Sequence, residues 1–202
     1  MLIQLPARFP LTSIELELDE PSQVIQDSLS GTPQVLSRGP GFWRGTATLA
    51  ASKRTEEARQ LSRFFAQLRK SQHTFRLPLK ENSNGTVESG TILSVGSSSL
   101  DSLTGVMTIV VTGAGGPSAS LADGDYVNIN NRLYQITGVG GSAGSYTAIP
   151  NVLPNNGQLV LWEDVYVVCR IDTTAGGGGV PVVYNRDFVS PRTFAWVEAI
   201  NG

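Results

Sequence analysis

One segment, residues 42–79, limits most strongly what this chain can fold into, because it predicts a strand, a helix and a strand in succession. Within it, residues 55–70 carry apolar side chains at every third or fourth position, which places them on one face of a helix. These side chains are Ala58, Leu61, Phe65 and Leu68, with Phe64 at the margin of the stripe. Other stretches lack a comparable helical period, so we expect one helix packed on a β-rich body.

The ends of this helix carry suitable side chains. Glu56 and Glu57 lie in the expected first turn, and Arg69 and Lys70 lie in the expected last turn. Both charge pairs suit the helix dipole, which is positive at its N-terminus. Ser52 or Thr55 can cap the N-terminus. We therefore expect the helix to span residues 55–70.

The composition favours a β-rich chain with many turns. Charged residues make up 16% of the 202 residues, whereas the chain contains 22 glycines and 11 prolines. The net charge of -2 gives no electrostatic basis for nucleic-acid binding. Cys169 is the single cysteine, which excludes an internal disulfide. Residues 1–10 do not resemble a signal peptide and no apolar run approaches a membrane span, so we expect a chain made in a cytosol that does not enter a membrane.

The order of the expected strands predicts two domains. Alternation predicts strands at 11–18, 42–50 and 74–79, while 19–40 reads as loop with one short strand at 34–36. Six short β-type runs then fall within 91–162, separated by turn signals that include the hairpin pair Asn130-Asn131. The last strands are expected at 165–171, 180–184 and 192–200, the final one central in its sheet, and the glycine run before 180 as a mobile loop.

The first part of the chain has too few strands to close a sandwich by itself, and the C-terminal strands supply more. We therefore predict a mainly β fold in which residues 1–85 and 166–202 form a β-sandwich domain with one helix. Residues 86–165 form an inserted small β-barrel, OB-like or similar.

The residue types that carry chemistry do not combine into a catalytic set. His73, the single histidine, directly follows the helix, which favours a packing or helix C-terminal role. Glu15 and Glu17 lie on one strand face, where solvated carboxylates are usual, and Asp123 with Asp125 resembles a calcium loop only weakly. Glycine runs at 110–118 and 137–144 read as hairpin loops, and Cys169 lies in an apolar strand. We expect no enzyme activity, no metal and no cofactor.

Three segments together resemble the distal tail proteins of tailed bacteriophages and related gene-transfer particles. They are residues 42–79, residues 120–138 and residues 192–200. In that family an aromatic residue and an arginine on a strand precede a helix, an inserted barrel carries a Gly-Asp hairpin, and an aromatic strand closes the chain. The positions here are Gly124, Asp125, Val127, Ile129 and Tyr134 for the hairpin, and Val197, Glu198, Ala199 and Ile200 for the closing segment.

The resemblance implies a structural virion protein at the tail tip, assembled in the host cytoplasm. Its members form hexameric rings that join the tail tube protein to hub or tail fibre proteins, with the first domain in the ring and the barrel outside it. DNA would pass through the channel without specific binding, so its lining should be neutral or acidic. Abundant strand edges agree with this, since pairing them across subunits of a closed ring protects them.

Two sets of site residues follow from these readings. For subunit contacts the candidates are Glu15, Glu17, Arg44 and Arg192, with carboxylates of one subunit facing arginines of the next. An alternative function is a carbohydrate-binding module for host adhesion, in which Tyr134, Tyr146 and Trp162 stack on sugars. These rings more often fill a small barrel. A cell-wall hydrolase using Glu15, Glu17 or Asp125 lacks a matched acid and base.

Overall fold

The computed structural model of this chain describes residues 1–6, 9–26, 33–37, 41–51, 55–68, 73–79, 92–102, 104–113, 121–140, 144–172 and 192–200. The chain divides into two compact units. One unit comprises Met1–Glu17, Trp43–Leu79 and Tyr166–Gly202, and the other comprises Leu18–Phe42 and Lys80–Val165. From the sequence we expected residues 18–42 to belong to the same domain as residues 1–17. In the structure, the contacts between Cα atoms group residues 18–42 with the second unit.

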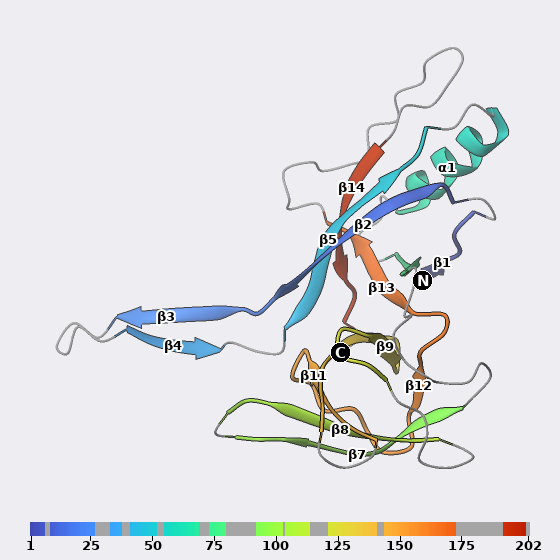
Figure 1. The fold of residues 1–202 in the computed structure, drawn as a ribbon. Coiled ribbons are helices and arrows are strands. Elements are labelled where there is room, and N and C mark those ends of the chain that lie inside the picture. The colour runs from blue at the N-terminus through green and yellow to red at the C-terminus, as the bar shows by residue number, and fades with distance from the viewer. Residues whose placement is uncertain are drawn as a thin grey trace. The chain divides into compact units, whose positions relative to one another are not determined.

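The first unit is built on a six-stranded sheet with the order β1-β6-β13-β14-β5-β2 (Figure 1). Its strands are β1 (Leu2–Ile3), β2 (Leu11–Asp19), β5 (Phe42–Leu49), β6 (Thr74–Pro78), β13 (Tyr166–Ile171) and β14 (Arg192–Glu198). β14 lies between β13 and β5, which confirms the expected central strand near the C-terminus. β1 runs parallel to β6, whereas β6, β13, β14 and β5 pair in antiparallel fashion.

One helix among the described residues, α1 (Thr55–Leu68), packs on one face of this sheet. The Phe65 ring meets Phe194 of β14 at 5.4 Å between centroids, and the Phe64 ring meets Phe75 of β6 at 5.5 Å. The expected stripe is confirmed, since Ala58, Leu61, Phe65 and Leu68 are all buried. The helix ends two residues before the predicted end, and Ser52, Arg69 and Lys70 lie outside the described residues.

The marginal position expected for Phe64 was wrong. Phe64 and Phe65 are each only 3% exposed. The reason lies outside the helix: Phe9, which precedes β2, places its ring edge-on against Phe64 at 5.7 Å. A helical period alone does not show that a second segment covers the side of the stripe.

The opposite face of the sheet carries polar side chains. Residues paired across neighbouring strands share a face, so Thr193 lies beside Thr48, and Arg44 lies on the same face across β14 from Arg170. Arg44, Arg170 and Thr193 are exposed. In the described part of the chain the sheet therefore has a helix on one face, whereas the other face combines these polar residues with apolar ones, among them the buried Val168. The second layer of the expected sandwich stays a prediction.

Residues 19–40 contain more regular structure than the sequence indicated. β3 (Ser22–Gln26) and β4 (Pro33–Ser37) form an antiparallel two-stranded sheet, so the loop expected over most of this segment was wrong. Among the described strands they pair only with each other. Prolines and serines weakened the strand signal, and alternation over five residues is too short to outweigh them.

The second unit contains a closed barrel with the strand order β10-β11-β8-β7-β12-β9, which confirms the expected small barrel. Its strands are β7 (Leu93–Leu100), β8 (Met107–Gly113), β9 (Tyr126–Ile129), β10 (Arg132–Val139), β11 (Ser145–Ile149) and β12 (Leu159–Leu161). Asn130 and Asn131 adopt φ values of 53° and 63° between β9 and β10, which is the left-handed geometry of a tight hairpin turn. The turn predicted from this pair is confirmed.

The barrel strands occupy a single stretch of sequence between two strands that are neighbours in the sheet. β6 precedes the barrel and β13 follows it, and these strands pair with Tyr166 opposite Pro78. The chain therefore leaves the six-stranded sheet and returns to it at adjacent positions. Pro78 lies at the end of β6, as expected from its missing N–H.

Candidate functional site

One edge of the six-stranded sheet is β2, which alternates half-buried apolar and exposed acidic residues. Ile14 and Leu16 are half-buried, while Glu15 and Glu17 are exposed, as the alternation predicted. Thr46 donates a hydrogen bond of 2.7 Å to Glu15 Oε2, and Arg44 Nε lies 3.4 Å from Glu17 Oε2. Both carboxylates therefore lie on the polar face of the sheet, and Ile14 and Leu16 lie on the helix side.

The interface candidates are thus partly engaged within one chain. Arg44 on β5 meets Glu17 on the neighbouring strand of the same subunit. The Arg192 backbone pairs with Leu49 at the start of β14, and its side chain lies outside the described residues. An exposed pair such as Glu17 with Arg44 contributes little to stability, so these carboxylates retain most of their hydration. Contacts from them to arginines of another subunit stay a prediction.

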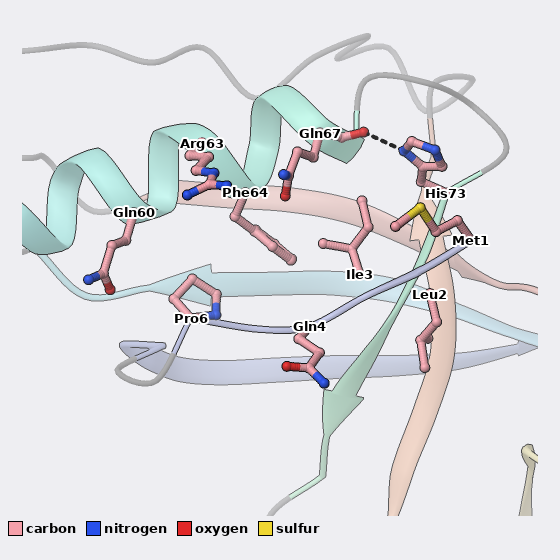
Figure 2. Close-up of a pocket in the computed structure, with 10 residues that line it drawn as sticks. All are labelled: Met1, Leu2, Ile3, Gln4, Pro6, Gln60, Arg63, Phe64, Gln67 and His73. Atoms are coloured by element: carbon pink, nitrogen blue, oxygen red, sulfur yellow. Dashed lines mark hydrogen bonds between the residues drawn. The ribbon is translucent and has the colours of Figure 1, made fainter.

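The other edge of the sheet holds a groove that the sequence did not indicate. It lies between the N-terminal segment that contains β1 and the flank of α1, with a cavity volume of about 760 Å³ (Figure 2). The lining residues are Met1, Leu2, Ile3, Gln4, Pro6, Gln60, Arg63, Phe64, Gln67 and His73. Figure 2 shows Ile3 and Phe64 facing each other, whereas Leu2 and Gln4 lie on the side of the segment away from α1.

The chemistry of this groove follows from its two walls. Gln60, Arg63 and Gln67 recur at spacings of three and four, so they form one flank of α1 beside the buried stripe. The floor is apolar, the α1 side of the rim carries two amides and a guanidinium, and the described residues that line the groove include no carboxylate. Side-chain amides both donate and accept hydrogen bonds, so this rim suits a polypeptide backbone. The spacing of these three helix residues was the available sequence signal.

His73 has the role predicted for it at the helix C-terminus. Its Nδ1 lies 2.7 Å from the carbonyl oxygen of Gln67, so the ring N–H donates to one of the last carbonyls of α1 (Figure 2). These carbonyls have no partner within the helix, and a histidine is a usual donor to them. The imidazole thus links the residue before β6 to the C-terminal end of α1, beside the groove.

A buried carboxylate lies at the end of β14. Glu198 is 3% exposed, and the backbone N–H of Trp43 donates to its Oε2 at 3.1 Å. It lies opposite Cys169 in the sheet. Burial raises the pKa of the Cys169 thiol well above its usual value and the charge of Glu198 raises it further, while a hydrogen bond from the Leu77 backbone lowers it. The buried, unreactive cysteine expected from the sequence agrees with this.

The barrel aromatics lie in its interior. Tyr134 and Tyr146 are 2% and 1% exposed and belong to the barrel core, and Trp162 packs against that core while half-buried. Tyr134 donates to the carbonyl of Val152, and the Tyr146 hydroxyl accepts from the N–H of Leu121. The ring faces of Tyr134 and Tyr146 are therefore not available for stacking on a sugar, because both rings fill the barrel.

Asp125 has a structural role in the barrel. Its carboxylate accepts a 2.8 Å hydrogen bond from the N–H of Ala122, which closes the turn before β9. It is buried, whereas Asp123 is exposed. Among the described residues no group of three or more His, Cys, Asp or Glu side chains is placed to hold a metal ion.

The barrel also presents an exposed apolar strip. Leu159 and Leu161 project outward from β12, at 57% and 43% exposure, on either side of the buried Val160. β12 pairs with β7 so that Val160 lies opposite Leu93, which puts Ile92, 63% exposed, beside Leu161. Exposed aliphatic side chains on adjacent strands form a surface suited to binding another protein.

Comparison with family models and with curated proteins finds no match to this chain. Within the described ranges, no helix is both long enough and apolar enough to cross a bilayer.

Proposed function

We propose that this chain is a structural subunit of a ring at the distal end of a bacteriophage tail. The ring joins the tail tube to hub or fibre proteins and keeps a channel open for DNA. In this proposal the first unit, with its six-stranded sheet, forms the ring. The proposal includes a second β-layer that completes a sandwich in this unit, and a ring of six subunits. The apolar strip of Ile92, Leu159 and Leu161 on the barrel provides a docking surface for hub or fibre proteins.

The observation that carries the proposal is the β3–β4 ribbon. It follows β2 in the chain and leads into β5, and among the described strands its two strands pair only with each other. A two-stranded ribbon in water is at best marginally stable, because it buries little apolar surface for the backbone entropy it costs. Packing against a neighbouring subunit stabilises a ribbon of this kind, so the ribbon favours a protein that works as an assembly.

The sheet edges support the same conclusion. Among the strands that the structure describes, β2 presents a nine-residue edge, and β1 at the opposite edge is two residues long. Each copy thus offers two different edges, and unlike surfaces pair head to tail into rings when the rotation closes. DNA passage would require a lining that does not retain phosphates, and the chain's net charge of -2 is compatible with that.

Removing the ribbon tests this proposal. We expect the full chain to sediment as a closed oligomer, and a variant in which a short Gly/Ser turn replaces residues 22–37 to sediment as a monomer with an unchanged thermal transition of the sheet. Sedimentation velocity and circular dichroism measure the two quantities. A matched control deletes residues 114–118, which lie in the sequence between β8 and β9, and this deletion should leave assembly intact. Assembly of the ribbon-free variant at wild-type concentrations would contradict the role of the ribbon.

A further inference from the structure

We infer that the groove between β1 and α1 is the acceptor for strand β2 of a second copy of this chain, so that the six-stranded sheet continues from one subunit into the next. This inference rests on the proposed ring and names the surfaces that build it. It commits to one occupant, the acidic edge strand of an identical subunit.

The two edges match in their apolar surfaces. Ile14 and Leu16 lie on the helix side of β2 and stay half-exposed within one chain. The groove lies on the helix side of β1, with Ile3 and Phe64 at its floor (Figure 2). A strand added beside β1 would direct alternate side chains under α1, so the half-exposed aliphatic residues of β2 would reach that floor.

The charges of the two edges are opposite. Residues 11–20 contain the four carboxylates of Glu15, Glu17, Asp19 and Glu20 and no lysine or arginine. At the acceptor edge Arg76 of β6 lies on the polar face, the same face to which Glu15 and Glu17 point, and β6 contains no carboxylate. Arg63 adds positive charge on the helix side, at the groove rim. Complementary charge of this kind directs the acidic edge of one copy to the basic edge of another and disfavours like-edge pairing.

Both edges have backbone geometry suited to pairing with a further strand. β1 and β2 are the outermost strands of the sheet among the described residues, so each has a row of N–H and C=O groups on its outer side. Gln60 and Gln67 lie above the acceptor edge and can bond the added strand where the short β1 ends. Each copy has one donor and one acceptor edge, and therefore the pairing yields a ring of several subunits and not a two-fold dimer.

Disulfide trapping tests the inference on the full chain. Leu2 and Gln4 lie on the face of the sheet away from α1, and so do Ser13 and Glu15 of β2. We therefore combine Gln4→Cys with Ser13→Cys in one double variant and with Glu15→Cys in another. The two variants test two registers of β2 against β1 of the next subunit. We expect mild oxidation to give a covalent ladder that ends at the ring mass, with each single variant giving dimers at most. Cys169 is fully buried and does not contribute. The control pair, Gln4→Cys with Thr193→Cys on the exposed central strand β14, should give no ladder.

Charge reversal provides the second arm. Arg76→Glu should raise the concentration at which the ring assembles by about tenfold, corresponding to about 1.4 kcal/mol, whereas Arg170→Glu, on the same polar face but on the interior strand β13, should change it less than about twofold. A ring that forms without either ladder, and whose assembly concentration is unchanged by Arg76→Glu, would overturn the inference and leave the proposed function intact. A chain that stays monomeric and gives no ladder would overturn both.

Discussion

Gly45→Ala is expected to destabilise the sheet unit by at least about 3 kcal/mol and to release β2 from the sheet edge. A Cβ atom added at Gly45 would lie 1.8 Å from the carbonyl oxygen of Glu15 and 3.2 Å from Cζ2 of Trp196. The first contact is with backbone, which cannot rotate away, and the second is with a fully buried ring. The strand pair must separate to admit one methyl group.

A neighbouring substitution separates this clash from the loss of a surface hydrogen bond. Thr46→Ala removes the 2.7 Å bond to Glu15 and adds no atom, so it should cost no more than about 1 kcal/mol. Chemical denaturation followed by fluorescence of Trp43 and Trp196, in a Trp162→Phe background, reports on the sheet unit alone. A Gly45→Ala variant as stable as Thr46→Ala would show that β2 does not approach β5 so closely.

Phe64→Ala is expected to cost about 3–5 kcal/mol, at least as much as Phe65→Ala. The Phe64 ring packs edge-on against Phe9, Phe65 and Phe75 at 5.3–5.7 Å, whereas the Phe65 ring meets Phe64 and Phe194. Removing Phe64 leaves a cavity that joins the groove beside it and detaches the segment before β2 from the helix.

The same denaturation measurement ranks the two variants. Arg59→Ala on the exposed face of α1 is the control and should change the free energy of unfolding by less than about 0.5 kcal/mol. A much larger loss for Phe65→Ala than for Phe64→Ala would place Phe64 at the margin of the core, as the helical period alone suggested.

The sequence predicted those elements whose periodicity arises from local burial. The α1 stripe, the alternation of β2 and the Asn130-Asn131 turn all follow from side chains that are neighbours in the chain. Phe64 was misplaced because the ring that covers it, Phe9, lies more than fifty positions away. β1 was missed because two residues are too few to show a period.

The candidate surfaces, too, could be predicted from the sequence only where they depend on residues that are neighbours in the chain. Glu15 and Glu17 were identified as a solvated strand face, since alternation determines which way they point. The groove was not identified, because it forms where a two-residue strand meets the flank of a helix almost sixty residues later. The role of Glu198 in accepting the N–H of Trp43 likewise depends on strands that are paired only in the folded sheet.

The central claim, a closed ring of identical subunits, is tested most directly by the native mass and symmetry of the purified full chain. Native mass spectrometry with electron microscopy should show one closed species, six times the 21.5 kDa subunit in the hexameric form we propose, with an open centre. Tail tube or hub protein should bind to it without changing the subunit number. A monomer at every concentration, with and without those partners, would contradict the account.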